Sequence, residues 1–265
     1  MTRVAFAIVL HELQERSRDR WVLVVTGLFT LLATGISAYG VATEDYSAIV
    51  TGPSLVTMAT FLVPLVALVL GHEAIVGERE RHTLGLLLSL PVHRSEVLLA
   101  KYTGRLLALG LSLALGLGLS CLFLGPGQRQ VVLGLISPTL LLGAAFLSVG
   151  VWISTACTRT ATAACIALAT WFLLVFIYDL ALLASLVATD GALSQDTITW
   201  AVSLNPAGLY RMTLMAELIG VSSLQELGLT VALPGTIKSV AIWVGWVTIP
   251  LAAGSYQLSR EGSGR

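Results

Sequence analysis

Six stretches of the chain consist mostly of apolar residues, and each is long enough to cross a membrane as a helix. They lie at Trp21–Val41, Pro53–Val76, Val97–Phe123, Val131–Ala156, Ala163–Ala188 and Ile237–Leu258. A spanning helix needs about 20 such residues, because the hydrocarbon core is about 30 Å thick and a helix rises about 1.5 Å per residue. The pattern therefore predicts an all-α integral membrane protein with six transmembrane helices.

The first twenty residues show helical periodicity, but their apolar run is too short to cross a membrane. The apolar positions recur at i, i+3, i+4 and i+7, and they are Phe6, Val9, Leu10 and Leu13. The charged positions fall on other faces of the same helix, and they are Glu12, Glu15, Arg16 and Asp19. We expect residues 1–20 to form an amphipathic helix in the cytoplasmic interface, with a short solvated lead-in as the alternative.

Two polar segments separate the apolar stretches and are long enough to carry structure. Residues 77–96 form the first, and residues 189–236 form the second and longest. In the second, Asn205 precedes Pro206 as an N-cap precedes the first helical position, and Ser223 with Glu226 fits a capping box. We expect short re-entrant or interfacial helices there, between spans five and six, with residues 259–265 as a tail.

The basic residues set the orientation. Twelve of the fifteen Lys and Arg residues fall on one side of the membrane if the six spans alternate. Only Arg129, Arg211 and Lys238 fall on the other side. Because Lys and Arg concentrate in cytoplasmic loops, both termini are expected in the cytoplasm of a multi-pass protein of the bacterial inner membrane.

Composition excludes several classes of function. The chain is 56% hydrophobic and 11% charged, whereas soluble domains average about 45–50% apolar and about 25% charged residues. Its net charge of zero gives no basic field for nucleic acid, and its three cysteines include no C-x-x-C pair. The zincin pattern starts at His11 and at His72 but lacks its second histidine, and no Gly-Lys pair exists for a P-loop. Neither catalysis nor ATP binding by this chain is expected.

The segment from Glu78 to Lys101 carries the most informative pattern, E-R-E-R-H-T-L-G-L-L-L-S-L-P-V-H-R-S-E-V-L-L-A-K. It resembles the loop after the second span in type-2 ABC exporter permeases. The matching positions are Glu78, Glu80, Thr83, Leu84, Leu86, Leu87, Leu88, Ser89, Pro91, Arg94, Glu96 and Lys101. His82 departs from the family, which usually has glycine before the threonine.

Further strings resemble one branch of that family, the permeases of the nitrous-oxide-reductase maturation (Nos) transporters. These strings are Ala74–Glu78, Trp171–Leu173 with Asp179, and Asn205–Pro206 with Leu209–Arg211. The resemblance implies that residues 21–258 form a non-catalytic permease domain that pairs with a second copy of itself. It also implies two cytoplasmic ATPase chains that bind the ATP and Mg²⁺, a possible periplasmic assembly protein, and a role in building a copper–sulfur enzyme.

The physical pattern of the loop is consistent with docking to such an ATPase. A short amphipathic helix over Glu78–Leu90 would offer charges for register and apolar side chains for burial, and Pro91 would end it. The residues assigned to coupling are Glu78, Glu80, Arg81, Thr83, Leu86, Leu87, Leu88, Pro91 and Arg94. The alternative is a plain cytoplasmic loop whose charges are solvated.

Asp179 is the outstanding polar residue within a predicted span. A charge at the centre of a membrane helix costs at least about 2.5–3.5 kcal/mol, so such a residue is a candidate for function. It either faces a translocation path or external partner, or it snorkels, or it pairs with an external group such as Arg211. The residues grouped with it are Tyr178, Asn205, Tyr210 and Arg211.

Soft metal ligands and small residues complete the inventory. Met212 and Met215 lie three apart and would suit Cu(I), but apolar packing explains them more simply, and no metal site is assigned. Small residues in spans three and four, such as Gly104 and Gly116, predict close helix packing.

The alternatives for function are an exporter of an unrelated drug, lipid or peptide, or an ATP-independent carrier or membrane anchor.

Overall fold

The computed structural model describes residues 3–18, 20–42, 47–89, 92–190, 192–219 and 234–260, and every regular element within them is helical. In chain order the helices are α1 (Arg3–Arg18), α2 (Arg20–Ala42), α3 (Ser47–Gly71), α4 (Val76–Glu80), α5 (Leu84–Leu88), α6 (Arg94–Ser120), α7 (Pro126–Ala156), α8 (Thr160–Phe172), the π-helical turn η1 (Leu173–Ile177), α9 (Tyr178–Ala188), α10 (Gln195–Leu204), α11 (Pro206–Ile219) and α13 (Thr236–Arg260). The predicted all-α class is confirmed.

Five helical stretches of the described chain have the length and composition of membrane spans. They are Gly52–Glu80, Arg94–Ser120, Pro126–Ala156, Thr160–Ala188 and Thr236–Arg260. These stretches match predicted spans two to six. The first predicted span is also helical, as α2, but its apolar segment Leu23–Tyr39 is shorter than the others. Six spans therefore remain a prediction.

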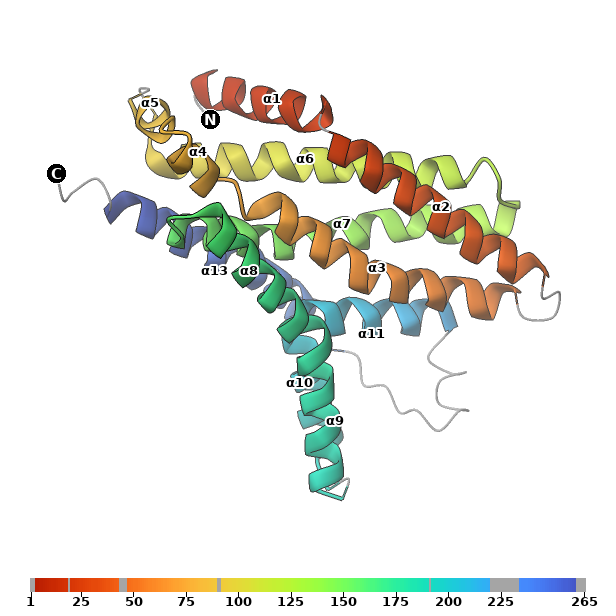
Figure 1. The fold of residues 1–265 in the computed structure, drawn as a ribbon. Coiled ribbons are helices and arrows are strands. Elements are labelled where there is room, and N and C mark those ends of the chain that lie inside the picture. Colours follow the sequence, from red (N-terminus) through yellow and green to blue (C-terminus); the bar gives the residue numbers. More distant parts are fainter. Residues whose placement is uncertain are drawn as a thin grey trace.

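The bundle is built around α7, which packs against α3, α13 and α6, while α1 and α2 both pack on α6. Figure 1 shows these helices running side by side, with α4, α5 and the C-terminus at one end and the α6–α7 turn at the other. Glycine permits a close crossing of α3 and α7, because a Cβ at Gly71 would lie 2.9 Å from the Gly150 Cα. Gly104 and Gly116 are likewise close to α1 and α2, which confirms the predicted close packing in span three.

Helix α1 forms where the sequence predicts a helix, and one of its sides packs on α6. Ala5, Val9 and Glu12 are buried against α6, whereas Phe6 is 57% exposed and Leu10 is 42% exposed. Glu12, which the helical pattern places on a polar side of the helix, therefore belongs to the side that packs on α6. Glu12 is buried because α6 supplies two cations opposite it, and the apolar residues Phe6 and Leu10 are left for the membrane.

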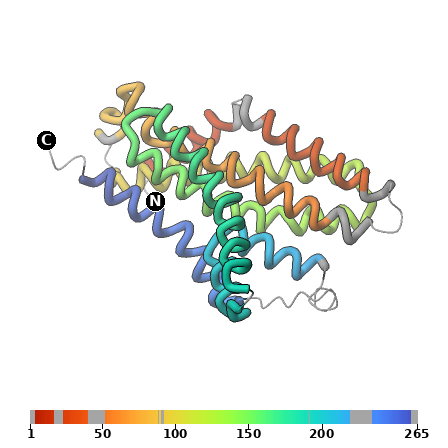
Figure 2. The backbone as a smooth tube through the Cα atoms, turned by 60° about the horizontal axis from the view of Figure 1, so that its bottom comes forward, coloured from red at the N-terminus to blue at the C-terminus, as the bar shows by residue number. Residues whose placement is uncertain are grey.

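The chain from Thr160 to Ala188 leaves the bundle as one long helix interrupted by η1. Figures 1 and 2 show α9 and α10 extending together away from the other helices. Asn205 holds this arm to its base, because its Nδ2 donates to the Leu174 carbonyl within η1 at 2.6 Å. A π-helical turn frees backbone carbonyls for such contacts.

Two helices, α10 and α11, lie between the predicted spans five and six, and α11 begins at Pro206 as the sequence predicts. Asn205 Oδ1 accepts a hydrogen bond from the Ala207 N–H at 3.1 Å, so the predicted N-cap is confirmed. Helix α11 packs on α3 and α7, and the Tyr210 hydroxyl lies 2.8 Å from Thr139 Oγ1. Ser223 and Glu226, the predicted capping box, lie outside the described residues.

Candidate functional site

The loop between α3 and α6 is folded as two short helices joined by a tight turn. The single helix predicted over Glu78–Leu90 is therefore wrong, since α4 ends at Glu80 and α5 begins at Leu84. His82 lies in the turn with φ of 58°, in the left-handed region that favours glycine. This is the position at which the sequence departs from the family's glycine. Pro91 and the side chain of Leu88 lie outside the described residues.

Thr83 closes the turn onto Glu78. Its backbone N–H donates to the Glu78 carbonyl at 3.0 Å, and its hydroxyl donates to the Glu78 carboxylate. The other oxygen of that carboxylate, Oε1, lies 2.9 Å from Lys101 Nζ on α6. Glu78 therefore links the turn of the loop to the first part of α6.

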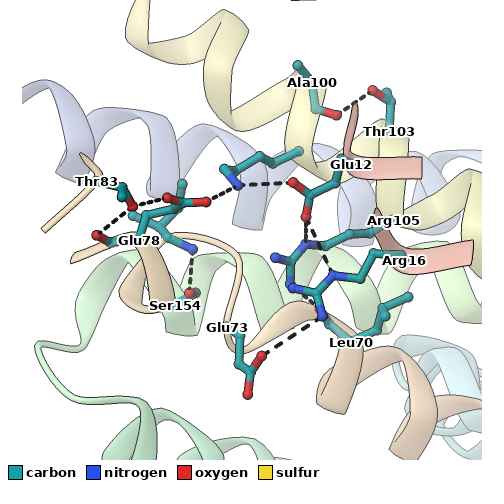
Figure 3. A network of polar contacts seen from close by, with 12 residues as sticks. Glu12, Arg16, Leu70, Glu73, Glu78, Thr83, Ala100, Thr103, Arg105 and Ser154 are labelled. Carbon is teal, nitrogen blue, oxygen red and sulfur yellow. Dashed lines mark hydrogen bonds and ion pairs between the residues drawn. The ribbon is translucent and has the colours of Figure 1, made fainter. Parts of the chain in front are cut away.

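Lys101 in turn connects the loop to α1, as Figure 3 shows. Its Nζ donates to Glu12 Oε2 at 3.0 Å, and Arg105 Nε donates to Glu12 Oε1 at 2.7 Å. The guanidinium of Arg105 also donates to the Leu70 carbonyl near the end of α3. We call Glu12, Glu78, Lys101 and Arg105 the anchor network; it joins four segments of the chain.

The anchor network is buried and balanced in charge. Glu12, Lys101 and Arg105 are 1–3% exposed, so each charge needs a partner close by. Burial by itself raises the pKa of Glu12, but Arg105, Lys101 and Arg16 outweigh it and lower that pKa to about 2. Glu12 is therefore ionised at every physiological pH, and two carboxylates face two buried cations.

Other polar groups fix the rest of the loop to α7 and α8. Ser154 Oγ accepts from the backbone N–H groups of Ile75 at 2.9 Å and Val76 at 3.0 Å. The guanidinium of Arg79 donates to the carbonyls of Thr155 and Cys157 at the end of α7. Helix C-termini favour such cations because their last carbonyls are unpaired and carry partial negative charge.

Glu80 and Arg94 make the matching contacts at two other helix ends. The carboxylate of Glu80 accepts from the Thr160 backbone N–H at 2.8 Å and from its hydroxyl at 2.6 Å, at the start of α8. Arg94 donates to the Leu258 carbonyl at 2.9 Å, near the end of α13. The acidic residue thus lies at a helix N-terminus and the basic residue at a C-terminus, as the helix dipole favours.

Much of the loop is exposed, and its exposed side chains include an apolar one. Leu86 is 74% exposed, and Arg81 and His82 are exposed beside it, while Leu87 is half-buried. We call Arg81, His82 and Leu86 the outer face of the loop.

The second group of predicted residues lies far from the loop, at the base of the α9–α10 arm. Asp179 Oδ2 lies 2.6 Å from Arg211 Nη2, so the pairing that the sequence left open is the one observed. Both side chains remain about one-third exposed. The Tyr178 hydroxyl donates to the Ala201 carbonyl at 2.5 Å. These residues connect α9, α10 and α11.

No group of three or more potential metal ligands among His, Cys, Asp and Glu occurs within the described ranges. Met212 and Met215 are both half-buried on α11, and Met215 packs against the apolar core. Within the described residues, both methionines are therefore explained by packing.

Sequence reasoning assigned Glu78 to the candidate site but missed Glu12 and Arg105. The available signal was the spacing of Lys101 and Arg105, four apart on a helix that is otherwise largely apolar near its start. Two cations on one face of a membrane helix require anions nearby. Glu12 is the acidic residue of α1 that lies opposite them.

Comparison with known proteins agrees with this architecture over nearly the whole chain. Residues 6–262 match the family model described as ABC-2 family transporter protein. The chain is 36% identical over 270 residues to the probable ABC transporter permease protein NosY of Pseudomonas aeruginosa, covering 96% of this chain and 98% of the relative. It is also 36% identical over 261 residues to a protein of the same description from Stutzerimonas stutzeri, covering 92% of this chain and 94% of the relative.

Proposed function

The chain belongs to the ABC-2 family of transporter proteins, and from this premise we propose that its loop couples the membrane domain to a separate ATPase chain. The proposal rests on the difference between the two sides of the loop. Its inner side is held by polar contacts to α6, α7 and α8, while its outer face presents Leu86 and two basic side chains. A rigid, outward-facing element of this kind transmits a push from a docked partner to the bundle.

This assignment divides the predicted coupling residues into two roles. Glu78, Glu80 and Arg94 position the loop, because their charged groups bond to residues of this chain. Arg81 and Leu86 are assigned to direct contact with the ATPase, because both are exposed. ATP and Mg²⁺ belong to that partner, and the present chain supplies no catalytic group.

Substitution of Leu86 tests the coupling role. Leu86→Glu places a charge in the apolar centre of the proposed contact, so co-purification of the ATPase in mild detergent should fall at least tenfold. Leu122→Glu is the matched control, since Leu122 is 70% exposed. It belongs to the turn between α6 and α7, which lies at the opposite end of the bundle (Figure 1). Equal ATPase retention by Leu86→Glu and by the wild-type chain would refute the coupling role.

We further propose that two copies of this six-span chain and two ATPase chains form one transporter, with both termini cytoplasmic. A single permease chain has one coupling loop, and two-fold pairing is the commonest symmetry of assemblies. Mass measurement of the solubilised complex should give two copies of the chain. A stable assembly with one permease and one ATPase would contradict this stoichiometry.

For the biological role we propose maturation of a copper–sulfur nitrous oxide reductase, supported by the similarity to two NosY proteins. Deletion of this chain should leave the reductase produced but deficient in copper, and the wild-type chain should restore its copper content. Export of an unrelated cargo is the alternative. A reductase with full copper content in the deletion strain would favour that alternative.

A further inference from the structure

Two of the long helical stretches are packed into the bundle along one part of their length and unpacked along the other. In α13 every buried residue lies at Pro250 or beyond it, and residues 236–249, all of which the structure describes, include none. We call residues 236–249 the first part of α13. In the stretch from α8 to α9 the last buried residue is Val175 in η1, and α9, which is described throughout, has no buried residue. Packing therefore changes at η1 in one stretch and at Pro250 in the other.

The unpacked parts are joined to one another through α10. The Tyr178 hydroxyl connects α9 to α10, as described above. On the other side of α10, Lys238 Nζ lies 5.1 Å from the centre of the Trp200 ring, and Trp246 Nε1 donates to the Leu204 carbonyl at 2.8 Å. We call α9, α10 and the first part of α13 the exposed unit.

Both changes in packing coincide with an interruption of the helical hydrogen bonding. Pro250 has no backbone N–H, so the Trp246 carbonyl, four residues earlier, lacks the donor that a regular helix supplies. In η1 the Tyr178 N–H donates to the Leu173 carbonyl, which is five residues earlier instead of four. Helices bend at prolines and at π-helical turns, because the regular bonding is already broken there.

A neighbouring side chain supplies a donor at each interruption. Asn205 Nδ2 donates to the Leu174 carbonyl in η1, and Ser148 Oγ on α7 donates to the Trp246 carbonyl at 2.7 Å. Serine hydroxyls compensate for proline in membrane helices in this way, since the hydrocarbon core offers no water. Ser148 Oγ also lies 2.6 Å from the Ala145 carbonyl of its own helix. A hydroxyl has one hydrogen, so the two bonds are alternatives, and Ser148 keeps an acceptor if α13 moves away.

The part of α13 that follows Pro250 is fixed to the bundle by polar contacts as well as by burial. Thr155 Oγ1 on α7 donates to Gln257 Oε1 at 2.9 Å. Arg94 at the start of α6 donates to the Leu258 carbonyl at 2.9 Å. This part of α13 therefore stays with α6 and α7, whereas the first part is held by the contacts to α10 and by the Ser148 hydroxyl.

We propose that the exposed unit moves as one body about two hinges, η1 and Pro250, while α8 and the rest of α13 stay packed in the bundle. Bending at these two points breaks fewer helical hydrogen bonds than bending at a regular turn. The Ser148 hydroxyl bonds to Trp246 in the observed arrangement and to Ala145 when the exposed unit swings away. This motion changes the shape of the membrane domain without unpacking the loop between α3 and α6. The inference does not depend on the coupling role of that loop.

Pulsed electron paramagnetic resonance between two nitroxide labels tests the hinges in the full-length chain. The three native cysteines are replaced, and labelled chain is diluted with unlabelled chain so that distances are measured within one copy. One label is placed at Leu107 on α6, and the other at Val240 or at Tyr256, which lie on the two parts of α13; all three side chains are exposed. We expect the Leu107–Val240 distances to be distributed at least about twice as widely as the Leu107–Tyr256 distances, because a hinge separates the two parts of α13. Equal widths would overturn the hinge at Pro250.

A third pair of labels tests whether the exposed unit is one body. Leu183 on α9 is exposed, as Val240 is. The Leu183–Val240 distances should be distributed as narrowly as the Leu107–Tyr256 distances, because both ends of this pair move together. A distribution as wide as that of Leu107–Val240 would overturn the single body.

Two substitutions test the hydrogen bond at the α13 hinge. Ser148→Ala removes the donor to the Trp246 carbonyl, so the distances from Leu107 to Val240 should be distributed more widely than in the otherwise unchanged labelled chain. Pro250→Ala returns a backbone N–H to the same carbonyl, so adding Ser148→Ala to Pro250→Ala should cause no further widening. An effect of Ser148→Ala that is equally large with proline and with alanine at position 250 would overturn the role of Ser148.

Ser112→Ala is the matched control for Ser148→Ala. Ser112 is also buried, and its hydroxyl donates at 3.0 Å to the Ala108 carbonyl within its own helix, α6. Ser112→Ala should therefore leave the distances from Leu107 to Val240 unchanged. Equal widening by the two substitutions would show that loss of a buried hydroxyl, and not of the bond to α13, causes the effect, and it would likewise overturn the role of Ser148.

Discussion

Removal of the charge on Glu12 should be among the most destabilising single changes at the end of the bundle that carries the loop between α3 and α6. Glu12→Gln keeps the shape of the side chain but takes away the carboxylate that faces Lys101 at 3.0 Å and Arg105 at 2.7 Å. Both cations stay buried, because they lie on α6 between helices that pack on either side. Glu78 then remains as the one carboxylate of the anchor network for two cations.

Two independent routes give a similar magnitude. Breaking a buried ion pair by removing one partner costs about 3–5 kcal/mol. The pKa of Glu12 is lowered from 4.5 to about 2, and each pKa unit corresponds to about 1.4 kcal/mol, which gives about 3 kcal/mol. For a chain of this size, about 3 kcal/mol corresponds to a fall in Tm of about 6–12 °C.

Thermal unfolding in mild detergent measures the effect, with Glu15→Gln as the matched control because Glu15 is exposed on the same helix. The pH dependence has a defined sign. A carboxyl with a lowered pKa stabilises the folded state fully above about pH 4.5, and that contribution is lost as the pH falls from 4.5 towards 2. In Glu12→Gln, Tm should therefore fall less steeply than in the wild-type chain as the pH is lowered below 4.5. If Glu12→Gln and Glu15→Gln unfold within 2 °C of each other, the anchor network does not stabilise the fold.

Three further predictions concern other parts of the chain. His82→Gly should leave stability unchanged or raise it by up to about 1 kcal/mol in the same unfolding assay, because relief of the left-handed φ outweighs the added freedom of glycine; a lower Tm would contradict this. Asp179→Asn should cost at most about 1 kcal/mol, since its pair with Arg211 is one-third exposed; a larger loss would make the pair a structural clamp, and normal transport output would remove Asp179 from the functional residues. Gly71→Ala should lower stability by about 1–3 kcal/mol, because its Cβ would meet Gly150 backbone atoms at 2.9–3.0 Å; a variant as stable as the wild-type chain would show that α3 and α7 separate freely.

The positions of the long helices were predictable because the membrane imposes one simple requirement. Each span needs a continuous apolar stretch with internally paired backbone groups, and that requirement is visible in composition alone. The N-cap at Asn205 was predictable for a local reason, since its side chain bonds to the Ala207 N–H only two residues away. Signals that act within one turn of helix are preserved in the sequence.

The anchor network was not predictable in the same way, because its partners are 89 and 93 residues apart in the chain. Periodicity placed Glu12 on the polar side of an amphipathic helix, and polar sides usually face water. The structure instead turns that side towards α6, where two cations compensate the cost of burial. The turn at His82 was not predicted either, since a histidine in a helix-like pattern does not itself indicate a positive φ, and only the glycine usual in the family at this position points to it.

Lys101 is the residue through which the two ends of the anchor network act on each other. Its single ammonium lies 2.9 Å from Glu78 on the loop and 3.0 Å from Glu12 on α1. If a docked partner moves the loop, Lys101 either follows Glu78 and leaves Glu12, or stays and loses Glu78. Either change takes Lys101 away from one of its two carboxylates and leaves a charge in the protein without its partner. The movement of lowest energy is therefore one in which α1, α6 and the loop move together. Glu78 and Lys101, which the alternative interpretation of the sequence treats as solvated charges, thus connect the loop, α6 and α1 at this end of the bundle.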